Sequence, residues 1–311
     1  MKILVTGSEG NVGRALVKHL KGKGHEVVRL DFMYINAVKE GDYFSWDVAI
    51  PMKPFSFPED IDVIYHLAAV VGRELCEDHL CEALYTNVVG TSNVIQLCKA
   101  LDAKLINFST SDIYGDTGKG YGYDYDIVIP MPVNHYGLSK WLAERVVYHE
   151  VTYSSLEAIV VRPFMLYSEY ESADNYKSAL IRFADSLWRN ERITVYKDTY
   201  RSWLHLDDAV VVFEKLLGYM KSDDVMGAAL DIGHPESVSA LELARMLLAA
   251  MGKTSREQEL VEVKELPAGI ARYKTPNLTE QELCLDFKPK ISIEEGIDRI
   301  VKKLKERSEN G

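Results

Sequence analysis

The chain has 311 residues, 47% of them hydrophobic and 27% charged, and this composition excludes a mostly disordered protein. No run approaches the roughly 18 apolar residues of a membrane helix, and we expect no membrane contact. Its 36 basic and 47 acidic residues leave a net charge of −11, which argues against a nucleic-acid partner. The first apolar run is too short for a signal peptide, and we expect a cytoplasmic protein.

The first half of the chain alternates strand-like and helix-like segments. Predicted strands cover residues 2–6, 25–30, 62–67, 104–109 and 156–161, and predicted helices follow residue 10 and cover 82–101 and 136–149. Such alternation predicts an α/β fold, a Rossmann-type doubly wound parallel sheet. We place this domain at 1–163, with chain returns near 205–235 that include a strand at 229–232. Residues 164–311, with helices near 240–251 and 293–305, are expected to form mainly a smaller mixed α/β substrate-binding domain.

Cysteines give no sign of a metal site. Cys76, Cys81, Cys98 and Cys284 include no C-x-x-C pair, so we expect no metal, and in a reducing cytosol no disulfide.

A glycine loop joins the first strand to the first helix. Gly7, Gly10 and Gly13 are spaced G-x-x-G-x-x-G. Glycines let the backbone approach a pyrophosphate, and the N-terminus of the following helix offers free N–H groups. The strand–loop–helix context therefore indicates a dinucleotide site.

An acidic residue ends the second strand. Asp31 follows Gly13 by 18 positions, where a carboxylate accepts hydrogen bonds from ribose hydroxyls and repels a 2′-phosphate. Because Phe32 and Met33 bring no positive charge, the sequence favours NAD over NADP, although Arg29 lies two residues upstream.

At this point the chain resembles the extended short-chain dehydrogenase/reductase family, and within it the NAD-dependent nucleotide-sugar epimerases and dehydratases, of the UDP-glucose 4-epimerase type. The resemblance runs from Met1 to about residue 300. Its motifs, in order, are Thr6–Gly13, Trp46-Asp47-Val48, His66–Ala69, Asn87 before Gly90-Thr91, Ser109–Gly115, Tyr136–Lys140, Arg162-Pro163-Phe164 and Arg201–Asp208.

The resemblance implies a set of site residues. Those at the cofactor would be Gly7, Gly10, Asn11, Val12, Gly13, Asp31, Phe32, Asp47, Val48, Leu67, Ala68, Ala69, Asn87, Ser109, Tyr136, Lys140 and Pro163. Those at the substrate would be Thr110, Asp112, Met165 and Arg201. It also implies a homodimer formed by the helices near 82–101 and 136–149.

Tyr136 and Lys140 lie four residues apart, on one face of a predicted helix. A tyrosine has a pKa of about 10, which an ammonium group and a positive nicotinamide both lower. Tyr136 would then take a proton from a sugar hydroxyl while hydride leaves the same carbon for NAD. By resemblance, the Thr110 hydroxyl would bridge the substrate oxygen and the tyrosine, unless it only caps the strand.

Asp112 stands where dehydratases and decarboxylases of the family usually carry glutamate and epimerases a small or hydroxylic residue. It would be a base for elimination, or it would only hydrogen-bond substrate or backbone. Arg201 resembles the arginine that grips the nucleotide diphosphate. The alternative is a surface ion pair with Asp198 or another acidic residue.

Two departures from the family pattern concern substrate binding. Met165 stands where many relatives have asparagine, and Glu265–Gly269 stands where many have an arginine before Pro-Gly-Asp. Either Arg272 or another group substitutes, or the substrate is not a standard nucleotide hexose. The segment from Tyr121 to Asp126 is either a mobile lid over the substrate or ordinary loop packing.

These residues predict a nucleotide-sugar 4-epimerase, acting on a UDP-linked sugar through a transient 4-keto intermediate. Three alternatives stay open: a dehydratase or decarboxylase with Asp112 as base, a sugar or polyol dehydrogenase that releases NADH, and an NAD-binding sensor or scaffold. The departures at Met165 and Leu266 favour the dehydrogenase somewhat, whereas the intact Thr110, Tyr136 and Lys140 argue against the sensor.

Overall fold

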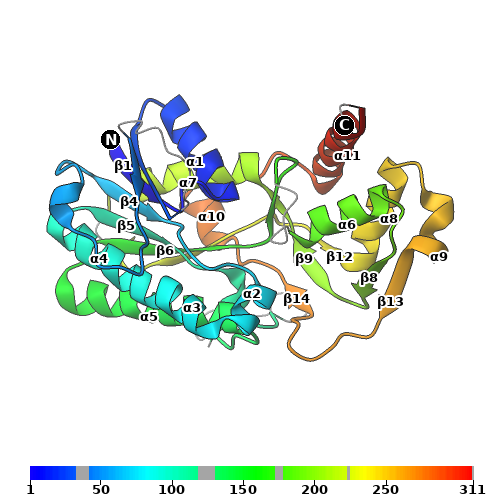
Figure 1. Cartoon of the computed structure of the whole chain (residues 1–311), viewed down its shortest axis with the longest axis horizontal. Coiled ribbons are helices and arrows are strands. Elements are labelled where there is room, and N and C mark those ends of the chain that lie inside the picture. Colours follow the sequence, from blue (N-terminus) through cyan, green and yellow to red (C-terminus); the bar gives the residue numbers. More distant parts are fainter. Residues whose placement is uncertain (33–41, 118–129, 172–177, 223–224, 310–311) are drawn as a thin grey trace.

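A computed structural model describes residues 1–32, 42–117, 130–171, 178–222 and 225–309. Figure 1 shows two lobes side by side, with the N-terminus in the larger lobe and the C-terminal helix in the smaller one. No helix in these ranges is both long and apolar enough to cross a membrane.

The larger lobe is built on a parallel sheet of seven strands in the order β11-β6-β5-β4-β1-β2-β3. Their bounds are β1 Lys2–Thr6, β2 Glu26–Asp31, β3 Tyr43–Ser45, β4 Val63–His66, β5 Lys104–Phe108, β6 Ala158–Pro163 and β11 Ala229–Ile232. The order reverses beside β1, so β1 and β4 lie at the switch point where ligands bind in such sheets. This arrangement confirms the predicted Rossmann-type fold.

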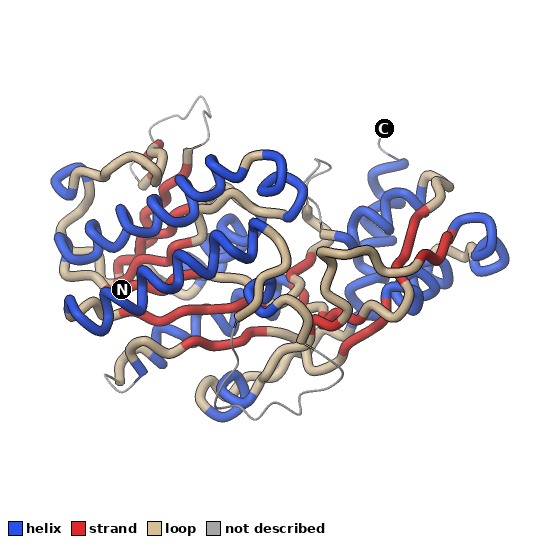
Figure 2. Tube along the Cα trace, turned by 90° about the horizontal axis from the view of Figure 1, so that it is seen from below, coloured by secondary structure: helices blue, strands red, loops and turns tan. Residues whose placement is uncertain are grey.

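Helices cover both faces of this sheet (Figure 2). On one face α1 (Asn11–Gly22) and α7 (Leu206–Tyr219) share an apolar core with the strands, through Leu16, Phe213 and Leu216 among others. On the other face, α4 (Gly90–Leu101) and α5 (His135–Ser154) form a second core through Val94, Ile95 and Val147. Burial on both faces explains why the strands are apolar throughout rather than alternating.

Two predicted helices differ from those observed. Helix α5 continues beyond residue 149 and ends at Ser154 before a left-handed Ser155, and its N-cap Asn134 accepts a hydrogen bond from Gly137 N. The segment predicted as one helix over 82–101 comprises α3 (Leu80–Leu84), a π-helical turn over Tyr85–Val89, and α4. The turn surrounds the buried Asn87, whose amide side chain bonds to residues outside the helix.

The smaller lobe has its own apolar core between α6 (Ala179–Trp188), α8 (Ala240–Ala250) and α11 (Ile293–Glu309). Its short strands are β8 Ile193–Tyr196 with β13 Val261–Lys264, and β9 Tyr200–Ser202 between β12 Ser237–Ser239 and β14 Tyr273–Lys274. Outside these groups, α2 Arg73–Asp78 packs against α5 and α10 Thr279–Leu283 against β11, both in the larger lobe. The strand β7 Leu166–Tyr167 pairs with β10 Leu204–His205, and α9 Glu257–Leu260 precedes β13. The domain boundary at residue 163 stays a prediction.

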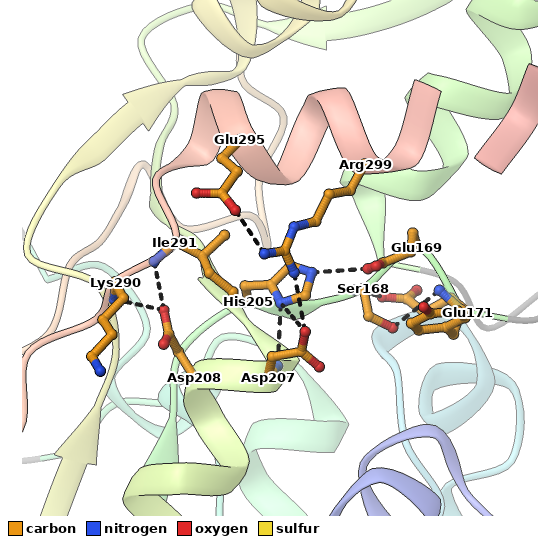
Figure 3. A network of polar contacts seen from close by, with 11 residues as sticks. Ser168, Glu169, Glu171, His205, Asp207, Asp208, Lys290, Ile291, Glu295 and Arg299 are labelled. Atoms are coloured by element: carbon orange, nitrogen blue, oxygen red, sulfur yellow. Dashed lines mark hydrogen bonds and ion pairs between the residues drawn. The ribbon is translucent and has the colours of Figure 1, made fainter. Parts of the chain in front are cut away.

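A polar network fixes the start of α7 beside α11, as Figure 3 shows. The buried His205 donates from Nε2 to Glu169 over 2.9 Å, since its Nδ1 accepts from Asp207 N. Arg299 of α11 bonds to Asp207 over 3.1 Å. Because Glu169 follows β7 and His205 ends β10, these contacts connect both strands and the start of α7 to α11.

Candidate active site

The loop between β1 and α1 accepts only glycine at two positions. At Gly7, which has a φ of +69°, an added Cβ would lie 2.6 Å from the Ala68 nitrogen, and at Gly13 it would lie 2.0 Å from the Gly7 carbonyl oxygen. Because no side chain caps the N-terminus of α1, its first N–H groups face the loop without an internal acceptor. This arrangement fits a pyrophosphate.

Asp31, at the end of β2, is oriented by two backbone donors. Its carboxylate accepts from Glu9 N and from Phe32 N, each over 2.8 Å. The Arg29 guanidinium is paired with the carboxylates of Glu9 and Asp42, at 3.4 and 3.0 Å, so its positive charge is already balanced by the protein. These contacts fit the adenosine ribose of NAD.

One cavity of about 1510 Å³ gathers almost every residue predicted for the site. All the predicted cofactor and substrate residues line it except Asn87. Asn87 lies behind the wall, where its amide bonds to the backbone of Val70 and to Ser139 Oγ. It supports the cavity rather than lining it. The segment predicted as a lid, Tyr121 to Asp126, lies outside the described residues.

Tyr136 and Lys140 project from the first turns of α5 into this cavity, and Thr110 follows β5. Burial, with a contribution from Asp112, raises the pKa of Tyr136 well above its usual value, whereas a hydrogen bond with Thr110 opposes this rise. Burial lowers the pKa of Lys140 to about 8, against the attraction of Glu144. At neutral pH the unliganded chain therefore holds a protonated phenol beside a cationic lysine.

Asp112 is tied to a lysine that the sequence analysis missed. Its Oδ1 accepts from Lys274 Nζ at 2.6 Å and from Asn134 Nδ2 at 2.9 Å. Thr110 Oγ1 lies 3.4 Å from the other carboxylate oxygen. Burial acts to raise the pKa of Asp112, but Lys274, Asn134 and Arg201 together lower it. A carboxylate stabilised in this way is a weak base.

Lys274 reaches the cavity from β14, 162 positions away in the sequence. It is 8% exposed, and burial lowers its pKa against the attraction of Asp112. No local pattern marks it, because it lies in a proline-containing segment without periodicity.

Arg201 lines the cavity, but its guanidinium is largely committed to the backbone. It donates to the carbonyls of Tyr200, Ala271 and Arg272 over 2.7–2.9 Å. The predicted alternative partner, Asp198, pairs with Arg272 at 3.5 Å instead. Arg272 is not among the residues lining the cavity, so it does not replace the missing diphosphate contacts there.

The chain belongs to the NAD dependent epimerase/dehydratase family, whose model matches residues 3–232. Its cofactor is accordingly NAD.

Among curated proteins, the chain is 26% identical to UDP-glucuronic acid decarboxylase 1 of Arabidopsis thaliana, over 99% of this chain and 70% of that protein. It is 25% identical to the UDP-N-acetyl-alpha-D-glucosaminuronate decarboxylase of Bacillus cytotoxicus, over 98% of both. Among solved structures, the UDP-glucose 4-epimerase of Thermotoga maritima is 21% identical with a TM-score of 0.86, over 99% of this chain and all of that one. The UDP-glucuronic acid 4-epimerase of Bacillus cereus is 22% identical with a TM-score of 0.84, at the same coverage.

Proposed function

We propose that this chain converts a UDP-linked uronic acid by oxidising C4, releasing the C6 carboxyl group as CO₂ and reducing C4 again. The observation that carries this proposal is the buried Lys274–Asp112 pair beside Thr110 in the cavity. It is supported by the two curated relatives, both named as decarboxylases of UDP-linked uronic acids.

The first step uses Tyr136, Thr110 and Lys140. Tyr136 removes the proton of the C4 hydroxyl, with Thr110 hydrogen-bonded to the phenol. NAD, when bound, supplies the hydride acceptor and a positive charge that favours the phenolate. Lys140 keeps its proton at neutral pH, since its lowered pKa is still about 8, and so remains a cation for binding.

Oxidation at C4 of a sugar with a C6 carboxyl group produces a β-keto acid. The C5–C6 bond then breaks, its electron pair forms an enolate with the C4 carbonyl, CO₂ leaves, and C5 takes up a proton. This step requires no base. It gains from a nearby cation, and we assign Lys274 to stabilise the enolate and to supply the proton. Return of the hydride to C4, with Tyr136 giving the proton back to the C4 oxygen, would restore the C4 hydroxyl and complete the cycle.

A 4-epimerase, our prediction from the sequence, is the second candidate. The engagement of Asp112 argues against a dehydratase, because a carboxylate held by Lys274 and Asn134 is a poor base for eliminating water, and this leaves epimerisation as the alternative to decarboxylation. In that case the 4-keto sugar would turn over and receive hydride on its other face, and its mass would not change.

Product analysis distinguishes these activities. The purified protein, without added NAD, is incubated with UDP-glucuronic acid, UDP-N-acetylglucosaminuronic acid and UDP-glucose, and the products are separated and weighed. Loss of CO₂ from a uronic acid is the expected result. A new peak of unchanged mass would favour the epimerase. Conversion that occurs only when NAD is added would favour a dehydrogenase. Tyr136→Phe serves as the inactive control.

A further inference from the structure

We propose that Arg182 of α6 binds the diphosphate of the nucleotide sugar, and that Glu74 occupies this arginine until the substrate replaces it. The inference rests on the proposed function insofar as the substrate is a nucleoside diphosphate sugar. It is independent of what happens to the sugar.

The residues predicted to bind the diphosphate offer few free hydrogen-bond donors to its oxygens. The guanidinium of Arg201 already donates to three backbone carbonyls. Met165 offers a thioether instead of an amide. The stretch that lines the cavity near Arg201 consists of Gly269, Ile270 and Ala271, none of which carries a charge. In a chain with a net charge of −11, a diphosphate needs other local cations.

Arg182 is a cation that lines the same cavity and has only a loose partner. Its Nη1 lies 3.9 Å from Glu74 Oε1, beyond hydrogen-bond distance, and the side chains are 52% and 73% exposed. Such an exposed ion pair contributes little free energy. Both residues line the cavity. A diphosphate oxygen can therefore replace Glu74 with little loss of free energy, and it forms a closer, charge-assisted hydrogen bond with Arg182.

The pair also joins the two lobes. Glu74 belongs to α2 and Arg182 to α6, which Figure 1 places in the larger and the smaller lobe. The catalytic residues Thr110, Tyr136 and Lys140 come from the larger lobe. A diphosphate bound to Arg182 would thus hold the sugar toward the catalytic residues and the nucleoside toward the smaller lobe.

The wall around Arg182 suits a nucleotide. Phe183 and Ser186 of α6 line the cavity together with Arg192, just before β8. Within the part of the chain that the structure describes, the guanidinium of Arg192 has no hydrogen bond or ion pair of its own. It is a second cation for the phosphates or the ribose.

Two substitutions should change affinity in opposite directions. With the NAD-bound protein, calorimetry should show the Kd of UDP rising about 10- to 100-fold in Arg182→Met, as expected for the loss of a charge-assisted hydrogen bond, with uridine binding unchanged. Glu74→Gln should lower the Kd of UDP by about 2- to 5-fold, because it removes the competing carboxylate. Arg182→Lys should lie between wild type and Arg182→Met.

Arg189→Met is the matched control. Arg189 follows α6, is 58% exposed, pairs with Glu191 and is not among the cavity-lining residues. Equal UDP affinity in Arg182→Met and Arg189→Met would overturn the inference, as would a parallel loss of uridine binding or a failure of the wild type to bind UDP. If UDP binds as expected but UDP-glucuronic acid is not converted, the proposed function fails and the assignment of Arg182 stands.

Discussion

At the scale of single residues, the proposed decarboxylation depends most on Lys274, which pairs with Asp112 in the cavity. Lys274→Met removes the cation beside Asp112, and we expect the rate of CO₂ release to fall about 100-fold or more, as for loss of an electrostatic and acid catalyst. Lys274→Arg, which keeps a cation at this position, should retain part of the wild-type rate of CO₂ release. Binding of UDP should change less than twofold, since Lys274 is assigned to the sugar.

The same measurement on Lys264→Met, an exposed position on β13, controls for general effects. CO₂ release at the wild-type rate in Lys274→Met would remove Lys274 from the mechanism.

Lys140 illustrates how the site trades stability for function. Its pKa of about 8 lies below the usual 10.5, so the folded chain binds the proton less tightly than the unfolded chain does. Below pH 8 the folded state therefore carries a penalty of order 3 kcal/mol. As pH rises from about 8 toward 10.5 the penalty is relieved, because the folded chain releases the proton first.

We therefore expect Lys140→Met to be more stable than the wild type at pH 7, with a free energy of unfolding, measured by urea denaturation, that is larger by about 1–3 kcal/mol. The variant should also lose turnover. The comparison uses protein stripped of NAD, and the difference should narrow toward pH 10. A constant difference across this range would contradict the assignment of a depressed pKa.

At the scale of elements, a buried ion pair fixes the helix that carries Tyr136 and Lys140. Glu144 of α5 is fully buried and accepts two hydrogen bonds from Arg162 of β6, over 2.7 and 3.0 Å. Arg162 also donates to Tyr114, which in turn donates to Asp231 of β11. The chain of contacts connects α5 to two strands of the sheet.

Glu144→Leu would leave the Arg162 cation buried without its partner. We expect a loss of about 3–5 kcal/mol in the free energy of unfolding, measured by urea denaturation. Glu157→Leu serves as the control, because Glu157 pairs with Lys104 at the surface and should change stability by less than about 1 kcal/mol. Similar losses in both variants would show that the burial of Glu144 is unimportant.

At the scale of the whole molecule, sequence patterns predicted those parts of the site whose geometry is set within a single loop, strand or helix. The glycine loop and the Tyr136–Lys140 spacing are each contained in one loop or helix, and Asp31 ends one strand, so the geometry of each follows from a single element. Lys274 could not be found in this way, since only the packing of β14 beside the catalytic strand ends brings it to Asp112. The engagement of Arg201 is likewise tertiary: its acceptors include the carbonyls of Ala271 and Arg272, some 70 positions away.

The predicted homodimer also belongs to this scale. A small hollow on α5 and the neighbouring π-helical turn is lined by Val88, Leu142, Arg145, Val146 and His149. We expect a dimer by light scattering, and a monomer for the double variant Leu142→Glu/Val146→Glu. Leu283→Glu, at an exposed position on α10, should leave the mass unchanged. A monomeric wild type would refute this prediction.

The proposed function requires that the hydride removed from C4 return to the same sugar, which would follow if the site held its NAD throughout the cycle. Its most direct test is to supply UDP-glucuronic acid deuterated at C4 and to locate the deuterium by mass spectrometry and NMR. The account predicts a product that has lost CO₂ and still carries deuterium at C4. Decarboxylated product without the label, or deuterium recovered in free NADH, would contradict it.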